Sequence, residues 1–262
     1  MNQITFKNWL APIVATIIFL IVWQVFSSAW DTSGIVVASP IAVFSVLFSQ
    51  AAYLTHHGLI TLGEASAGFA IGSAIGIGLA VLFVFSGVAE RALYPYAIIV
   101  KAIPLVALAP IIVSFFGGDI ASKVVMAAII SFFPVLVSAA DGFRGVDHDA
   151  VDLMRSFSAT RWDIFRLLQW PQALPQIFAG LKISSSFAVV GAVVAEFVNA
   201  DVGIGSIIRK SSYYLETDIN FAAIFVAAIA GLFLFAVVSV VGRKVVFWQK
   251  PFDSQKQKPF NP

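Results

Sequence analysis

The chain has 262 residues, of which 60% are hydrophobic and 11% are charged, and its mean hydropathy is +0.93. Soluble globular domains carry about twice as much charge and less apolar surface, so a soluble fold is excluded. The net charge of +2 does not indicate a nucleic-acid partner, since Lys and Arg gather in a few loops, and the lack of cysteine excludes disulfides, thiolate nucleophiles and cysteine metal ligands.

Six apolar runs predict an all-α polytopic membrane protein, because each approaches the ~20 residues that cross a bilayer as a helix. The predicted spans cover residues 10–28, 65–85, 95–116, 121–140, 178–199 and 220–242. We expect residues 1–262 to form a single transmembrane domain. The polar residues 249–262 are expected to be a disordered cytoplasmic tail.

The charges of the loops predict the orientation of the chain. A cytoplasmic N-terminus places twelve Lys and Arg residues on the inner side and three on the outer side. Because positively charged loops favour the cytoplasm, both termini are expected to be cytoplasmic. Between the first two spans, Pro40 precedes the amphipathic stretch 41–54, which is expected to form a helix on the external surface.

The second predicted span has glycine at every fourth position, at Gly68, Gly72 and Gly76. This spacing leaves a flat helix face that another backbone can approach closely. The glycine stripe therefore predicts a tight contact between helices, and it carries no information about a substrate.

The third predicted span contains Lys101, Pro104 and Pro110 in the run KAIPLVALAPIIVSFFG. Each proline removes a backbone donor and allows a kink, so a bent helix beside a cavity is expected. Lys101 lies inside the predicted cytoplasmic edge of the membrane. It would either snorkel or form a salt bridge, or line a water-filled path, and both interpretations stay open.

The longest polar region, residues 141–176, lies between the fourth and fifth spans and is expected to be the main cytoplasmic feature. Its apolar residues fit short helices, and Pro171 and Pro175 are expected to stop regular helix before the fifth span. Exposed Phe157, Trp162 and Phe165 would offer anchors to a partner protein, because aromatics are frequent interface hot spots. A helix resting on anionic lipid is the alternative.

The fifth predicted span carries Glu196 and Asn199, which are three residues apart and would share a helix face near the outer end. They are candidates for a gate or a substrate contact. A structural hydrogen-bond pair between helices is the favoured interpretation.

Sites for metals and nucleotides are not expected. His56 and His57 are adjacent, so they point apart on a helix, and no third ligand type clusters near them. The sequence has no GxxxxGK[ST] loop to cradle a phosphate. We therefore expect no catalytic residue, cofactor or metal in this chain, and ATP would be handled by a partner.

The segment DAVDLMRSFSATRWDIFRLLQWPQALPQIFAGLK resembles the EAA motif of binding-protein-dependent ABC transporter permeases. TLGEASAGFAIGSAIGIGLA, KAIPLVALAPIIVSFFG and AEFVNADVGIGSII are similar to segments of the nitrate, sulfonate and taurine branch, and the likeness spans about residues 60 to 245. Asp149 replaces the usual glutamate of the motif, and Ser158 replaces its glycine. The expected ATPase-coupling loop comprises Asp149, Ala150, Arg155, Ser158, Arg161, Trp162, Phe165, Pro171, Pro175 and Gly180.

This resemblance implies the permease subunit of an ATP-driven importer in the bacterial inner membrane. The implied partners are a second copy of the chain, two cytoplasmic ATPase subunits that bind ATP and Mg, and an external substrate-binding protein. Sulfonates, taurine, nitrate, pyrimidine precursors and flavins are the implied substrates. The alternatives are a self-sufficient channel or ion-coupled carrier that uses Lys101 and Glu196, and an intramembrane enzyme, for which a paired catalytic constellation within the spans is missing.

Overall fold

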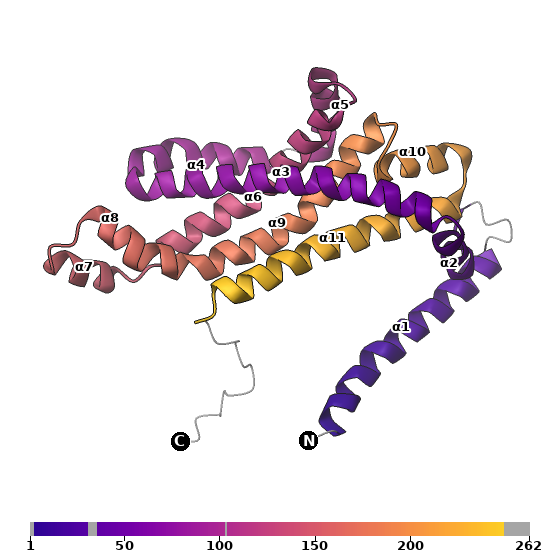
Figure 1. Ribbon diagram of the computed structural model, residues 1–262, viewed down its shortest axis with the longest axis horizontal. Helices are drawn as coiled ribbons and strands as arrows, with labels where there is room; N and C mark the ends of the chain where they lie inside the picture. The colour runs from indigo at the N-terminus through magenta and orange to yellow at the C-terminus, as the bar shows by residue number, and fades with distance from the viewer. Residues whose placement is uncertain (1–2, 31–35, 103, 249–262) are drawn as a thin grey trace.

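The computed structural model describes residues 3–30, 36–102 and 104–248, and the predicted tail 249–262 lies outside them. The described elements are all helices, as the composition predicts (Figure 1). In chain order they are α1 (Gln3–Trp30), α2 (Pro40–Ser49), α3 (Ala51–Phe85), α4 (Gly87–Ala102), α5 (Leu105–Phe116), α6 (Ile120–Arg144), α7 (His148–Ser156), α8 (Arg161–Ile164), the π-helical turn η1 (Phe165–Gln169), α9 (Trp170–Val198), α10 (Ile204–Tyr214) and α11 (Thr217–Val245).

Five helical stretches of the described chain are long and apolar enough to cross a membrane. They are α1, α3, α6, the continuous run from α8 through α9, and α11, and they match five of the six predicted spans. Helix α3 is 35 residues long and begins at Ala51, so it extends well before the predicted span 65–85.

The predicted bent helix over residues 95–116 is instead divided into two helices. These residues are divided between α4 and α5, with Pro104 in an extended conformation at the start of α5. Proline lacks a backbone N–H and its ring clashes with a preceding helical turn, which accounts for the start of a new helix after Pro104. Figure 1 shows the result, since α4 runs back beside α3 whereas α5 projects from the bundle.

The predicted surface helix 41–54 is present in part as α2. Pro40 occupies its first turn, where a missing N–H costs nothing, and the Ser39 hydroxyl accepts a hydrogen bond from the Ala42 N–H at 3.2 Å. The helix ends at Ser49, and residues 51–54 already belong to α3.

The centre of the molecule is formed by α3, α6 and α9, and α11 packs alongside α9 (Figure 1). Small buried residues such as Ala65, Ala127 and Ala192 let these helices approach closely. The Ser184 hydroxyl donates to the Ser131 carbonyl between α9 and α6. Larger side chains, including Leu136 and Ile177, fill the end of the bundle near α8.

Helix α1 diverges from the other long helices and approaches them only near α2 (Figure 1). There the Trp23 indole donates to the Ala38 carbonyl at 3.1 Å and its ring stacks on Phe225 of α11. The apolar side chains of α1, such as Ile18 and Phe19, are largely exposed. This surface suits contact with lipid or protein.

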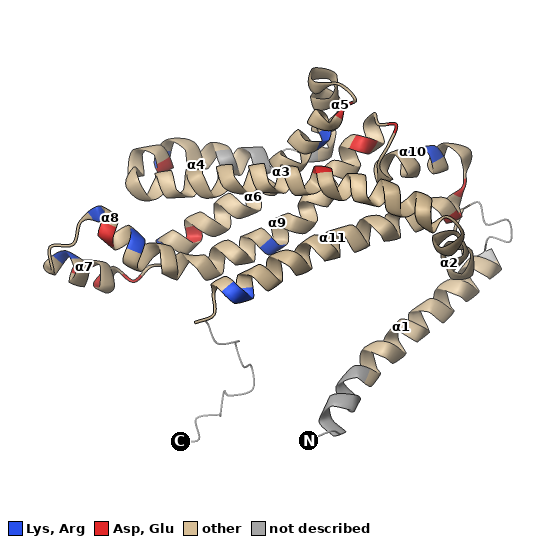
Figure 2. Cartoon of the chain, viewed as in Figure 1, with Lys and Arg blue, Asp and Glu red and all other residues tan. Residues whose placement is uncertain are grey.

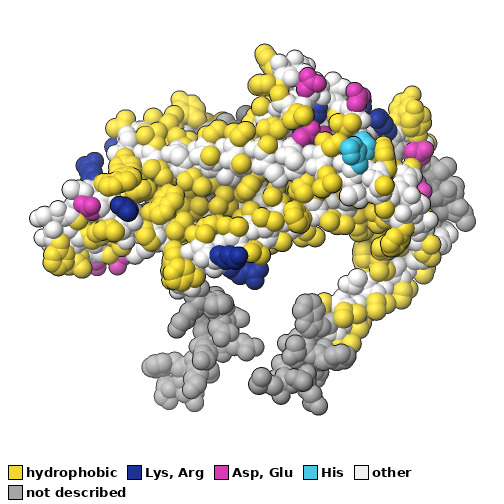
Figure 3. Space-filling model, viewed as in Figure 1, with side chains coloured by type: hydrophobic (Ala, Val, Ile, Leu, Met, Phe, Trp, Pro, Cys, Tyr) yellow, Lys and Arg dark blue, Asp and Glu magenta, His cyan; other side chains and the backbone are white. Residues whose placement is uncertain are grey.

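Most charged residues lie toward two ends of the bundle, and a few lie on α9 and α11 between them (Figure 2). One end carries α7 and α8, and the other carries α10 and the base of α5. Between them, the visible face of the long helices is covered mainly by hydrophobic side chains (Figure 3). The candidate functional residues therefore fall into two separate groups.

Candidate functional site

The α7–α8 segment, residues 147–165, forms a compact unit at one end of the bundle. Helix α7 is capped by Asp147, whose carboxylate accepts from the Asp149 N–H at 3.0 Å. A capping box begins α8, where Thr160 and Asp163 each accept a hydrogen bond from the backbone N–H of the other. The two helices are held together by a small core of Val146, Val151 and Ile164.

Ser158 lies at the position that the EAA motif gives to glycine, and its φ is +59°. The Ser158 N–H donates to the Arg155 carbonyl and the Ala159 N–H donates to the Met154 carbonyl. This pair of bonds is a Schellman motif, which ends α7 in a left-handed residue. Serine therefore adopts here a left-handed backbone conformation that glycine adopts more readily than other residues.

We expect Ser158→Gly to stabilise the α7–α8 segment by up to ~1 kcal/mol, because the left-handed conformation costs a side chain ~1–2 kcal/mol and glycine's greater freedom in the unfolded chain offsets part of the gain. Ser158→Val should be destabilising, since a β-branched side chain is strained at positive φ. The thermal midpoint of the purified protein measures both effects. A lower midpoint for the glycine variant than for the valine variant would contradict this assignment.

The exposed aromatic surface of the segment differs from the prediction. Phe157 and Trp162 are exposed, at 78% and 57%, but Phe165 is only 7% exposed, so the expectation that Phe165 is a surface anchor is wrong. Its ring packs among Phe85, Phe143 and Trp170, which come from α3, α6 and α9. Trp162 also stacks partly on Phe85.

Among the other predicted residues of the loop, Asp149, Arg155 and Arg161 are exposed and Ala150 is half-buried. Asp149 and Ala150 are in the first turn of α7, and Arg155 pairs with Asp152 at 2.8 Å on the same helix. Arg161 is the exposed first residue of α8.

The prediction that Pro171 and Pro175 stop the helix is also wrong, because the helix continues through both. Pro171 lies in the first turn of α9, where its missing N–H is tolerated, and the π-helical turn η1 directly precedes it. Pro175 lies inside α9. Gly180 follows at a close contact with α6, where an added Cβ would lie 2.5 Å from the Cβ of Ser138.

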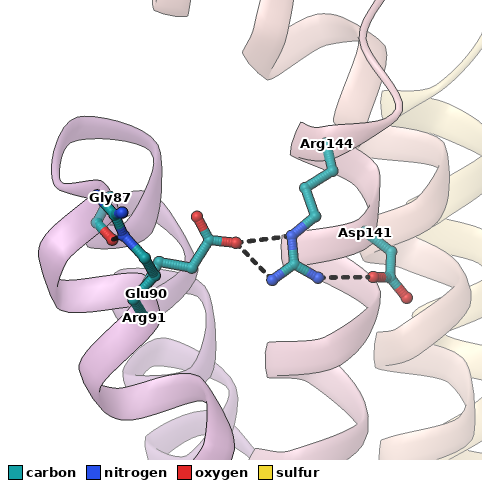
Figure 4. Close-up of polar contacts among 5 residues, drawn as sticks. All are labelled: Gly87, Glu90, Arg91, Asp141 and Arg144. Atoms are coloured by element: carbon teal, nitrogen blue, oxygen red, sulfur yellow. Dashed lines mark hydrogen bonds and ion pairs between the residues drawn. The ribbon is translucent and has the colours of Figure 1, made fainter.

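An ion-pair group joins α4 to α6 near this end. In Figure 4, Glu90 of α4 points toward Arg144 of α6 and accepts from its Nε at 2.7 Å, while Asp141 lies on the other side of the guanidinium at 3.4 Å. The Arg144 guanidinium also lies 4.3 Å from the centre of the Tyr94 ring. These contacts attach α4 to the bundle despite the break that follows it.

The glycine stripe on α3 faces α6. An added Cβ would lie 2.4 Å from the Ala127 Cβ at Gly68, 2.4 Å from the Ala128 carbonyl oxygen at Gly72, and 2.9 Å from the Phe132 carbonyl oxygen at Gly76. The backbones of α3 and α6 thus meet along these three residues.

The two prolines predicted to bend the third span are both exposed. Pro104 begins α5 and Pro110 lies within it. Lys101 belongs to α4, and its side chain lies outside the described residues. At the place where the sequence predicted a bent helix, the chain forms two separate helices, α4 and α5.

Glu196 and Asn199 do not share a helix face as expected. Helix α9 ends at Val198, and Asn199 is an exposed, extended C-cap residue that lies against Gly118. Glu196 is fully buried. Because α9 ends one residue before Asn199, the side chain of Asn199 is not on the helix face that carries Glu196.

Glu196 is the centre of a buried polar network that holds the α9–α10 connection, residues 199–203, against α3. Its carboxylate accepts from the Thr61 hydroxyl at 2.7 Å and from the Gly205 N–H at 2.6 Å. Thr61 in turn accepts from the Ile204 N–H, and His57 Nδ1 accepts from the Gly203 N–H, both at 2.9 Å. Gly203 has φ +95°, and an added Cβ would overlap the Glu196 carboxylate.

The sequence interpretation missed Thr61 in this network, and it also missed two other buried polar residues, Glu64 and Lys123. Glu64 and Lys123 are buried, at 6% and 3% exposed, and each is a charged residue within an apolar run. That placement was the available signal, because charged side chains within membrane helices are costly and usually face protein. Within the described residues, no group of three or more His, Cys, Asp or Glu side chains is suited to a metal ion.

Comparison with known proteins identifies related chains over most of this length. Residues 72–248 match the family model described as "Binding-protein-dependent transport system inner membrane component". A probable ABC transporter permease protein of Haemophilus influenzae is 33% identical, over 86% of this chain and 92% of its own. The formylaminopyrimidine transport permease protein of Halalkalibacterium halodurans is 30% identical, over 92% of this chain and 96% of its own. A putative aliphatic sulfonates transport permease protein of Bacillus subtilis is 27% identical, over 94% of this chain and 90% of its own.

A chain from inward-facing structures of the MetNI methionine ABC transporter has a similar fold. The TM-score is 0.65 over 75% of this chain and 98% of that chain, with 17% identity. At this identity the comparison concerns the fold alone.

Proposed function

Because this chain belongs to the binding-protein-dependent inner membrane components, the permeases of ABC transporters, we propose that it forms, as a dimer, the substrate path of an ATP-driven importer. The resemblance to the nitrate, sulfonate and taurine branch is confirmed. The chain is therefore a multi-pass protein of the bacterial inner membrane and is not itself the catalytic subunit. ATP and Mg are expected in the partner ATPases.

The α7–α8 segment is the observation that carries this proposal. It exposes Phe157 and Trp162 at one end of a helical bundle, and its own small core makes it a unit that can transmit force. We propose that these two aromatic side chains insert into a groove of the ATPase. Arg155 and Arg161 would orient the two proteins relative to each other. Two ATPase subunits would engage the segments of two permease copies.

Transport requires the dimer to alternate between two openings. Shifting a two-state equilibrium from 1:99 to 99:1 takes roughly 5.5 kcal/mol of differential interaction. Exposed ion pairs contribute only about 0–1 kcal/mol each, so aromatic side chains that become buried in the ATPase interface must supply most of the coupling. Ser158, Pro171, Pro175 and Gly180 would then hold the shape of the coupling loop.

The path itself is proposed to run beside α5 and the α9–α10 connection. Lys101 and Pro104 flank the break between α4 and α5, and Pro110 lies within α5. The break would allow α5 to move separately. Glu196 and Asn199 lie at the end of α9 and form the proposed gate, with the glycine stripe as a fixed packing surface behind it.

The proposed substrate is a small solute such as a sulfonate, taurine, nitrate, a pyrimidine precursor or a flavin. Permeases for formylaminopyrimidine and aliphatic sulfonates are relatives of this chain at 30% and 27% identity. An external binding protein would deliver the solute and set much of the specificity.

Co-purification and reconstitution test the proposal. The permease is expected to retain an ATPase through detergent purification and to take up solute in vesicles only with ATP and a loaded binding protein present. Candidate solutes are compared by their stimulation of ATP hydrolysis. Transport without any ATPase would instead support a self-sufficient channel or an ion-coupled carrier.

We also expect both termini to be cytoplasmic, because this orientation places twelve of the loop Lys and Arg residues inside and three outside. A reporter fused at Lys258 should be active only as a cytoplasmic reporter. External activity of that fusion in a chain that still transports would refute the orientation.

A further inference from the structure

Two short helices lie toward the end of the bundle that holds the proposed gate (Figure 1). Helix α5 has 12 residues and helix α10 has 11, so each is too short to cross a bilayer as a helix. Each must therefore be held in place by its contacts with the long helices. The contacts of α10 differ in kind from those of α5.

The first turn of α10 is capped by side chains of two other helices. A helix has no internal partners for its first N–H groups. At this helix, three consecutive N–H groups donate to side chains of α3 and α9 over 2.6–2.9 Å: Gly203 to His57, Ile204 to Thr61 and Gly205 to Glu196. The Thr61 hydroxyl also donates to Glu196 at 2.7 Å, so α3, α9 and α10 share one set of hydrogen bonds.

The start of α10 also fits closely against α9. An added Cβ at Gly205 would lie 2.6 Å from the Cβ of Glu196 and 2.8 Å from the backbone nitrogen of Phe197. An added Cβ at Gly203 would overlap the Glu196 carboxylate, and its φ of +95° is one that glycine adopts without strain. Rotation of α10 on α9 would therefore break this fit together with the hydrogen bonds.

The apolar face of α10 is packed into the same end of the bundle. Ile204 and Ile207 are at most 2% exposed and belong to one cluster with Leu54 of α3 and with Ala222 and Ala223 of α11. The Asn220 side chain of α11 donates to the Ser212 hydroxyl of α10 at 2.6 Å. Helix α10 is thus connected to α3, α9 and α11.

Helix α5 is attached to the bundle by apolar side chains of one face. Ala109 and Ile112 pack with Met126 of α6 and Ala195 of α9, whereas Phe115 is 83% exposed. Apolar contacts have no fixed direction, so one set can be exchanged for another as a helix turns.

Both ends of α5 are places where the helical path is broken. Pro104 begins the helix in an extended conformation, and Gly117 ends it with φ +77°. Directly after Gly117, the carbonyls of Gly118 and Asp119 accept hydrogen bonds from Lys123 of α6. The chain is therefore fixed to α6 just beyond Gly117, and a change in the direction of α5 would fall at that glycine.

Movement of the two helices would have unequal costs. Separation of α10 from α3 and α9 would leave three buried N–H groups unpaired. Each unpaired group lowers the population of such a state by roughly tenfold. Rotation of α5 would only exchange apolar contacts.

We propose that His57, Thr61 and Glu196 are positioning residues that keep α10 fixed on α3 and α9 throughout the transport cycle, and that α5 is the helix that moves at the gate. This inference rests on the proposed function, because it assigns a fixed wall and a moving wall to the same substrate path. Glu196 then acts by holding α10 in place, and contact with the solute is not required of it.

Distances between spin labels in the assembled permease–ATPase complex test this assignment. The permease contains no cysteine, so labels attach only at introduced cysteines when a cysteine-free ATPase is used. One label is placed on α3 by Leu59→Cys, and the second is placed either on α10 by Tyr213→Cys or on α5 by Phe115→Cys, all at exposed positions. Dilution with unlabelled permease isolates the distances within one copy.

The nucleotide-free and ATP-bound complexes are compared. The α3–α10 distance is expected to stay the same, and the α3–α5 distance is expected to shift. A shift of the α3–α10 distance, or an unchanged α3–α5 distance, would overturn the inference. Uptake without ATP would refute the proposed function itself, whereas ATP-driven uptake with a moving α10 would refute only the assignment of fixed and moving helices.

Removal of one hydroxyl provides a second test. Thr61→Val keeps the shape of the side chain but leaves the Ile204 N–H unpaired and takes one donor from Glu196. The α3–α10 distance should become broadly distributed, and the amount of solute moved per ATP hydrolysed should fall about tenfold, since one unpaired buried donor shifts an equilibrium by that order. Thr61→Ser should restore both. Thr55→Val, which removes an exposed hydroxyl from the same helix, should change neither.

The ratio of solute to ATP separates positioning from stability. If Thr61 only stabilised the fold, Thr61→Val would lower the yield of the complex and leave this ratio unchanged in the complex that remains. An unchanged ratio in Thr61→Val, or a lowered ratio that Thr61→Ser does not restore, would overturn the proposal.

Discussion

Replacing Gly72 by leucine is expected to prevent α3 and α6 from packing and to abolish transport. An added Cβ alone would lie 2.4 Å from both the Ala128 carbonyl oxygen and the Ser131 hydroxyl. The first of these atoms belongs to backbone and cannot rotate away, so the two helices must separate. The cost should exceed the ~1–3 kcal/mol usual for an overpacked core.

Yield after detergent extraction, thermal midpoint and substrate-stimulated ATP hydrolysis measure this effect. Gly78→Leu is the matched control, because Gly78 is on the same helix and has no atom within 4 Å of its added Cβ. Normal stability in Gly72→Leu, or equal damage in both variants, would show that the glycine stripe does not set the distance between α3 and α6.

Truncating both Phe157 and Trp162 to alanine should separate the permease from its ATPase while leaving insertion and folding intact. These are exposed aromatics of the α7–α8 segment, and a hot-spot aromatic contributes about 2 kcal/mol or more to a protein interface. Losing two such anchors should lower affinity by at least about a hundredfold. Co-purification of the ATPase and stimulation of its activity are the measurements.

Two further variants make this test specific. Phe48→Ala removes an aromatic of α2 that is equally exposed but distant from the α7–α8 segment, so ATPase binding should be unchanged. Phe165→Ala should instead unfold part of the bundle, since truncating a buried phenylalanine typically costs ~3–5 kcal/mol. If the Phe157 and Trp162 double variant bound the ATPase fully, the better interpretation would be that the α7–α8 segment rests on the lipid surface.

Local sequence patterns predicted much of this architecture. Apolar length identified five of the spanning helices, because that signal depends only on consecutive residues. The spacing of Gly68, Gly72 and Gly76 indicated a close helix contact, and the structure places that face against α6. Pro104 indicated a bend, but its extent depends on how α4 and α5 pack, which the local sequence does not encode.

The remaining errors concern residues whose environment is formed by distant parts of the chain. Phe165 appeared accessible within a polar loop, yet Phe85 and Phe143 of other helices cover it. Thr61 and Glu196 are 135 residues apart in sequence, so no spacing rule could pair them. The i, i+3 argument for Asn199 failed because it assumed a helix that ends at Val198.

The uninterrupted helical path from α8 into α9 has a mechanical consequence. Arg161–Val198 spans 38 residues, or about 57 Å at 1.5 Å per residue, which is enough to connect the two ends of the bundle. Its compliant points, η1 and Pro175, both lie in the half of this path nearer to Arg161. A displacement of Trp162 should therefore be absorbed or redirected near its origin, and beyond Pro175 α9 should move as a stiff rod that carries Glu196 with it.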